Sequence, residues 1–231
     1  MNNIFKNTLQ LIVWAFLAFS VDGGWAFAAD VDLAVAVKRL QAAYEKTNNV
    51  SADFVQETIP AGANEGIEAR GKVFFARPSK MRWEYEEPEE QLIVTSGKDV
   101  FVFEKEAGQV MVIPRKRFLS SEISQAFFFG KAKLDKYFRI ESPRAKWLDG
   151  KAHLRLEPLK ENMQIKTMWI GLDPDSGLVR HVWMEDRLGT RTHIIFSNIS
   201  INSRLSPRIF EFKCPKGVEI YRSQDISFKE E

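Results

Sequence analysis

Residues 71–88 read GKVFFARPSKMRWEYEEP and contain the clearest strand signal in the chain. From Lys80 to Tyr85, charged and apolar side chains alternate one by one. Successive side chains of a strand point to opposite faces of its sheet, so this period of two predicts a strand with one buried face. Val73-Phe74-Phe75, just before it, is apolar on both faces, which predicts a neighbouring strand covered on both sides.

Working outward, short stretches with strand character alternate with turn signals such as Glu87-Pro88, Ser96-Gly97 and Asp149-Gly150. These stretches cover residues 51–58, 66–76, 91–96, 99–104, 108–113, 137–142, 151–157, 164–172, 177–187 and 190–200. Short strands joined by tight turns predict an antiparallel meander that closes, or nearly closes, into a barrel. An amphipathic helix is expected before it, with Leu33, Val37, Leu40 and Tyr44 on one side and Asn48-Asn49 at its end.

Several strands are apolar on both faces, so something must cover or fill both sides of the sheet. The mid-chain candidate is Ser120 to Tyr137, in which a short helix would carry Ile123, Phe127 and Phe128 and end at Gly130. One interpretation is a segment wedged between the sheet and its contents. The equally open alternative is an ordinary core helix with one exposed aromatic side chain.

The N-terminus reads as a secretory signal peptide, with Lys6, an apolar run from Leu9 to Phe19 and a small-residue site at Ala26-Phe27-Ala28. Cleavage there divides the chain into a leader, residues 1–28, and one domain, residues 29–231. The run is shorter than the roughly 20 residues that span a bilayer, so we expect an exported, soluble protein. The net charge of +2 gives no strong field for nucleic acid, and the single cysteine, Cys214, excludes an internal disulfide.

No motif in the sequence names a reaction. His153, His181 and His193 have no cysteine or carboxylate at metal-ligand spacing, so each is expected to be solvated or hydrogen-bonded. The run 173–177 has the aspartates of a calcium loop without its later ligands, which favours a turn. The carboxylates of Glu84 to Glu90 could form a glycosidase pair, but a solvated turn explains them without any further assumption and is strongly favoured.

The opening stretch also closely resembles the outer-membrane lipoprotein carrier family, LolA, above all in Arg77-Pro78 followed by Trp83. The resemblance extends over nearly all of residues 29–231. Its further motifs are Leu40 to Tyr44, Ala52-Asp-Phe54-Val-Gln56, Ser96-Gly97-Lys, Gln109-Val110, Asp173-Pro-x-Ser-Gly177-Leu, Asp186-Arg-Leu-Gly189-Thr, Phe196-Ser-Asn198 with Asn202 and Leu205, and Phe210-Glu-Phe212-x-x-Pro215-x-Gly217-Val218.

The resemblance implies an unclosed antiparallel β-barrel, or half-barrel, with an N-terminal helix and a helical lid over an apolar cavity. It implies a periplasmic, monomeric carrier with no catalysis, cofactor or nucleic acid. The carrier would take acylated lipoproteins from an inner-membrane ABC transporter to the outer-membrane receptor LolB. Arg77 would be the latch that hydrogen-bonds the lid of the empty carrier, whereas without the family it would read as a strand-end surface arginine. The lid would be about Ser120–Tyr137.

Candidate residues for the cavity or lid lining are Met81, Trp83, Phe101, Phe103, Val110, Val112, Ile123, Phe127 and Phe128. A shift of one residue in register would move any strand's set to the other face. The rival hypotheses are a related carrier or sensor for another lipid or mislocalised lipoprotein, a glycan hydrolase, and a structural β-sandwich with a filled interior.

Overall fold

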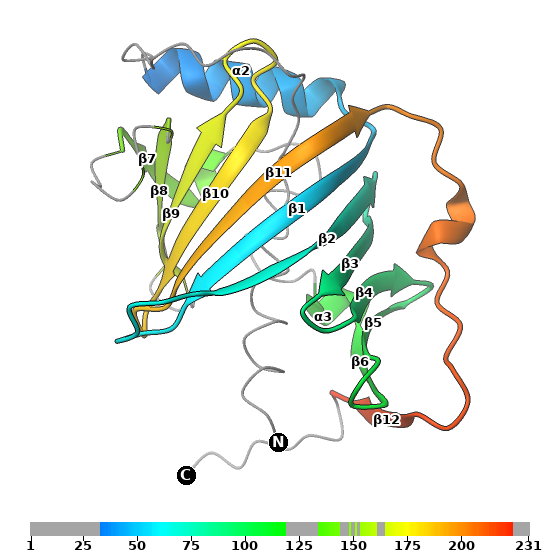
Figure 1. Ribbon diagram of the computed structural model, residues 1–231. Helices are drawn as coiled ribbons and strands as arrows, with labels where there is room; N and C mark the ends of the chain where they lie inside the picture. Colours follow the sequence, from blue (N-terminus) through cyan, green and yellow to red (C-terminus); the bar gives the residue numbers. More distant parts are fainter. Residues whose placement is uncertain are drawn as a thin grey trace.

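The computed structural model describes residues 33–118, 134–143, 148, 151, 153–160 and 165–223. The predicted leader and most of the predicted lid, with Ile123, Phe127 and Phe128, lie outside these residues. Within them, the chain folds into one sheet and a few short helices (Figure 1). The strands are β1 (Asn49–Ile59), β2 (Ile67–Ala76), β3 (Lys80–Glu87), β4 (Gln91–Ser96), β5 (Asp99–Glu104), β6 (Gln109–Pro114), β7 (Phe138–Glu141), β8 (Leu154–Pro158), β9 (Ile165–Leu172), β10 (Val179–Asp186), β11 (Arg191–Ile201) and β12 (Glu219–Arg222).

The sheet has 12 strands in the order β12-β6-β5-β4-β3-β2-β1-β11-β10-β9-β8-β7. Two antiparallel meanders meet where β1 pairs with β11, and β7 and β12 are the two edges. The prediction of a mainly β, unclosed fold is therefore confirmed, and the sandwich alternative is wrong because all the strands belong to one sheet. One strand differs from the prediction: β12 was missed, and it pairs with β6 in parallel.

The helix α2 (Leu33–Lys46) lies across one end of the sheet (Figure 1). Its buried side chains are Ala36, Leu40, Ala43 and Tyr44, which confirms the predicted amphipathic helix. They join a single apolar cluster with side chains of eleven strands, β1 to β11, including Phe54, Trp83 and Phe196. We call the sheet face that contributes to this cluster the inner face, and the opposite one the outer face.

The C-terminal segment covers the outer face of the first meander. After β11 the chain forms η3 (Pro207–Phe210), and the backbone carbonyl of Ile209 accepts a hydrogen bond of 2.9 Å from Arg82. Phe212 then stacks on Phe101, with 4.7 Å between ring centroids, before β12 reaches the edge of β6. The sequence predicted that both faces of the apolar strands must be covered. On the outer face, part of that cover is the C-terminal segment of the chain, which the sequence pattern did not indicate.

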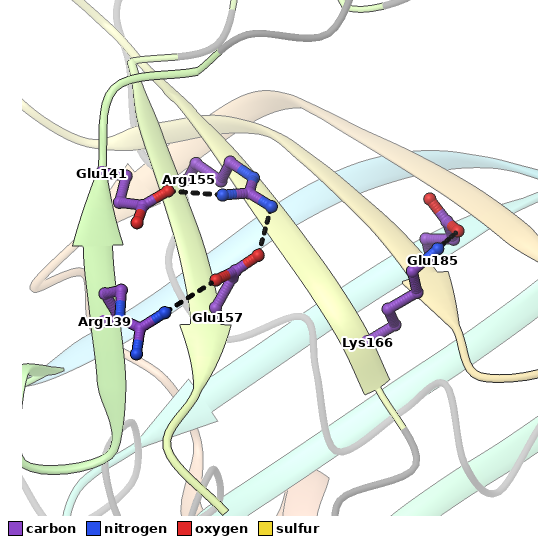
Figure 2. A network of polar contacts seen from close by, with 6 residues as sticks. All are labelled: Arg139, Glu141, Arg155, Glu157, Lys166 and Glu185. Carbon is purple, nitrogen blue, oxygen red and sulfur yellow. Dashed lines mark hydrogen bonds and ion pairs between the residues drawn. The ribbon is translucent and has the colours of Figure 1, made fainter. Parts of the chain in front are cut away.

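Charged side chains line the outer face near the other edge. Figure 2 shows Arg155 between Glu141 and Glu157, at 2.5 Å from the Glu141 carboxylate, with Arg139 at 3.5 Å from Glu157. Lys166 pairs with Glu185 at 2.6 Å in the same region. Short, charged edge strands such as β7 discourage the pairing of one sheet with another.

Replacing Phe212 by alanine should lower the free energy of unfolding by about 2 kcal/mol, because a half-buried aromatic stack on the outer face is lost. Chemical denaturation measures the change. Leu188→Ala is the control, since that side chain is 83% exposed and its truncation should cost less than about 0.5 kcal/mol. Equal effects of the two substitutions would show that the C-terminal segment does not cover the sheet.

Candidate functional site

Trp83 is the centre of the inner face. Its side chain is 0% exposed and its ring lies 4.8 Å from Phe54, 6.1 Å from Phe75 and 6.1 Å from Phe196, centroid to centroid. These rings come from β3, β1, β2 and β11, which are neighbours in the sheet. Met81, also 0% exposed, belongs to the same cluster. The structure therefore brings two of the predicted lining residues together in the apolar cluster of the inner face.

Four other predicted lining residues lie on the outer face. Trp83 is paired with Ile93, and Ile93 with Val102, so Val102 shares the inner face. Phe101 and Phe103 flank Val102 in sequence and therefore point the other way. The remaining two, Val112 and Val110, are paired with Phe101 and Phe103 and share their face. The predicted lining set is thus divided between both faces of the sheet, and these four pack on the side where Phe212 lies.

Polar side chains interrupt the apolar inner face next to Trp83. The Tyr85 hydroxyl donates a hydrogen bond of 3.0 Å to Oε1 of Gln56, and the Gln56 amide donates one of 3.2 Å to Thr58. Tyr85 and Gln56 are both buried, and burial raises the pKa of the Tyr85 phenol well above its usual range. We call Tyr85, Gln56 and Thr58 the polar strip. The sequence did not predict it, because its residues lie on strands that only the fold brings together.

Arg77 contacts the C-terminal end of α2. Its guanidinium donates a hydrogen bond to the backbone carbonyl of Tyr44 and lies over the Tyr44 ring, 4.6 Å from the centroid. Its backbone N–H donates to the carbonyl of Asn48 at 2.9 Å. The last carbonyls of a helix lack partners and carry partial negative charge, so a cation there is favourable. Arg77 thus holds the helix whose buried side chains pack against the inner face at one end of the sheet. The part of the predicted lid that it was expected to contact lies outside the described residues.

Two further contacts hold α2, and both use motif residues named in the sequence. Asn202 adopts the left-handed backbone conformation, with φ of 51°. Its side-chain amide donates a hydrogen bond of 2.9 Å to the carbonyl of Lys46, and its side-chain oxygen accepts one of 2.7 Å from the backbone N–H of Asn48. Near the middle of α2, Arg39 donates a hydrogen bond of 2.5 Å to the carbonyl of Pro174 in the turn that follows β9. Sequence reasoning missed these roles because each one joins residues far apart in the chain.

The residues considered for other chemistry have structural roles. In the 173–177 turn, Asp173 accepts hydrogen bonds from the N–H and hydroxyl of Ser176, so the turn interpretation is confirmed. The acidic run forms surface ion pairs, among them Glu86 with Lys72 at 2.7 Å and Glu90 with Lys105 at 2.5 Å. Among the described residues, no three metal-ligating side chains gather closely enough to hold an ion. No described helix has the length and apolar character needed to cross a membrane.

The histidines are hydrogen-bonded, as predicted. Nδ1 of His153 accepts from the N–H of Leu172 at 3.0 Å, and His181 shares a 3.1 Å hydrogen bond with His193 on the outer face. The ring of Trp183 stacks on both of the paired histidines. Burial, and then the nearby His193, lower the pKa of His181 to about 3.

Because the pKa of His181 is about 3 in the folded protein and near 6.5 in the unfolded chain, the unfolded chain binds more protons between these values. Stability should therefore fall as the pH falls below 6.5, by roughly 2 kcal/mol at pH 5 from this group. Denaturation curves at pH 7 and pH 5 measure the loss. His181→Asn should show a smaller loss over that interval, and an unchanged loss would contradict the assignment.

A family model described as "Outer membrane lipoprotein carrier protein LolA" matches residues 45–213, which include the inner-face rings, Arg77 and Asn202. The chain belongs to the LolA family. An outer-membrane lipoprotein carrier protein of Chromobacterium violaceum is 30% identical over 188 residues, covering 81% of this chain and 87% of the relative. One from Methylococcus capsulatus is 26% identical over 200 residues, covering 87% and 93%. A solved LolA superfamily structure from Nitrosomonas europaea is 13% identical, covers 79% of this chain and 98% of that one, and has a TM-score of 0.42.

Proposed function

We propose that this protein is a periplasmic carrier that binds the acyl chains of lipoproteins against its inner face and takes them from the inner to the outer membrane. The observation that supports this proposal most directly is the family match, which includes the inner-face rings and the residues that hold α2. The relatives bear the name of outer-membrane lipoprotein carriers. Residues 1–28 would direct export, and the carrier would act as a monomer without catalysis.

The chemistry of the cargo demands a carrier. Moving one methylene out of water gains about 0.8 kcal/mol, so a 16-carbon chain gains about 12 kcal/mol. For two or three such chains, the free energy gained on leaving water exceeds the roughly 20 kcal/mol at which non-covalent binding saturates. A cargo of this kind cannot dissociate into water at a useful rate. It must pass directly from an inner-membrane ABC transporter to the carrier, and then to an outer-membrane receptor of the LolB type.

Such a transfer requires a binding face that is covered when empty and uncovered when loaded. We propose that α2, held by Arg77, and the predicted lid at about Ser120–Tyr137 provide this cover. Met81 and Trp83 on the inner face would contact the chains, whereas Phe101, Phe103, Val110 and Val112 would support the sheet from behind. Ile123, Phe127 and Phe128 remain proposed lid residues.

Protein purified from its native periplasm should carry acylated polypeptide. Mass spectrometry under non-denaturing conditions should give an added mass equal to that of one triacylated lipoprotein. A bound free fatty acid or phospholipid would instead indicate a related carrier for another lipid. Protein that lacks any bound lipid, and does not take up lipoprotein from inner-membrane vesicles that contain the transporter, would contradict the proposal.

Arg77→Leu should still accept lipoprotein but should deliver several-fold less to receptor-bearing membranes, because α2 loses the contact that favours the empty, closed state. The measurement is the fraction of radiolabelled lipoprotein that moves from the variant to outer-membrane vesicles. Arg70→Leu, which removes an exposed arginine on the neighbouring strand, is the control. Normal delivery by Arg77→Leu would contradict the latch, and a parallel fall in thermal stability and uptake would indicate a purely structural role.

A further inference from the structure

Trp83 has a buried hydrogen-bond donor that no described residue satisfies. Its indole Nε1 lies wholly inside the protein without a hydrogen-bond partner among the residues that the structure describes. Most buried polar atoms in folded proteins are hydrogen-bonded, because a buried N–H that has lost water without gaining a partner is costly. A phenylalanine would fill the centre of the inner face without that cost, so the presence of an indole needs an explanation.

The rings around Trp83 are mostly apolar, and one of them, Tyr85, has a polar hydroxyl. Rings of Phe54, Phe75 and Phe196 contact the indole, while Tyr85 lies two residues along the same face of β3. The rings of Trp83 and Tyr85 are neighbours, with 6.3 Å between their centroids. The Tyr85 hydroxyl donates its proton to Gln56, and the indole N–H makes no hydrogen bond of normal geometry with the Tyr85 oxygen.

We propose that the Trp83 indole N–H binds a carbonyl oxygen at the head of an acyl chain, with the Tyr85–Gln56 pair as its polar neighbour. This inference rests on the proposed carrier function and names the chemical group that the inner face recognises. An indole N–H can only donate, so its ligand must bring an acceptor. The acceptors that an acylated cargo brings into an apolar face are the oxygens of the ester or amide groups that attach its chains.

The consequence is selectivity for acyl over alkyl chains. A carbonyl oxygen that enters an apolar face loses its hydrogen bonds to water, and an unsatisfied donor at that place restores one. An ether-linked chain has the same methylene content and gains the same apolar contacts, but its oxygen is a poorer acceptor. The inner face of this protein should therefore bind ester-linked chains more tightly than ether-linked chains of equal length.

The test uses two probes of equal chain length, a diacylglyceryl peptide and its dialkyl ether analogue, titrated into the wild-type protein and Trp83→Phe. The wild-type protein should bind the ester probe about tenfold more tightly than the ether probe, as expected for one hydrogen bond, and Trp83→Phe should lose most of this preference. Trp169→Phe is the matched control, because that buried tryptophan belongs to a separate cluster with Trp183 and should keep the preference.

A second measurement does not depend on the stability of the variant. In the wild-type protein, the indole proton of Trp83, assigned through its contacts with Phe54, should move downfield with the ester probe and much less with the ether probe. Equal binding of both probes by the wild-type protein, or an indole proton unchanged on loading, would overturn the inference while leaving the carrier function intact. If neither probe binds the wild-type protein, the carrier function fails and this inference fails with it.

Discussion

Water must be excluded from both faces of one sheet, and the rest of the structure depends on how this is done. The middle strands have large apolar side chains on each side, with Trp83 and Val102 facing inward and Phe101 and Val94 facing outward. Two stacked sheets would satisfy this requirement with a sandwich, but here all 12 strands form a single sheet. Each face therefore needs a cover of a different kind.

The two covers differ in how they are attached. On the outer face, Phe212 stacks on a neighbouring ring and β12 adds main-chain hydrogen bonds at the edge of β6, so the C-terminal segment is joined to the sheet along its length. On the inner face, two of the four buried side chains of α2 are alanines, which contribute little apolar area. Polar contacts from Arg77 and Asn202 at its C-terminal end, and from Arg39 near its middle, add to its attachment. Under the proposed function, release of this helix would break these few hydrogen bonds and the apolar contacts of Leu40 and Tyr44.

Local patterns predicted the elements well because period two and helical spacing are local properties. The alternation in Lys80–Tyr85 marks β3 to within two residues, and the amphipathic pattern marks α2. The face that each strand presents was not predictable, because the orientation of Val102 relative to Trp83 is fixed only by pairing through Ile93. β12 was missed for another reason: all four of its residues are exposed, so no burial period marks it.

The candidate site was harder to predict than the fold, and the family motifs show why. Arg77 and Trp83 stand out in the sequence, yet their partners, Tyr44 and Phe54, lie some 30 residues earlier on other elements. A strong motif identifies a residue that matters, but only the fold shows whether it holds a helix or contacts a ligand. Arg77 contacts α2 through a main-chain carbonyl, and the sequence at position 44 alone could not have indicated this partner.

The polar strip on the inner face fits the physical demands on a carrier that must release its cargo. A wholly apolar wall would bind several acyl chains so tightly that transfer to another protein would be slow. Tyr85, Gln56 and Thr58 keep part of the wall polar even though their side chains bond to one another. Such a wall would obtain less binding free energy from contact with methylenes and more from contact with the polar head of each chain. Under the proposed function, affinity would then depend on where the head lies, and a chain could leave in steps as its head moved to the next protein.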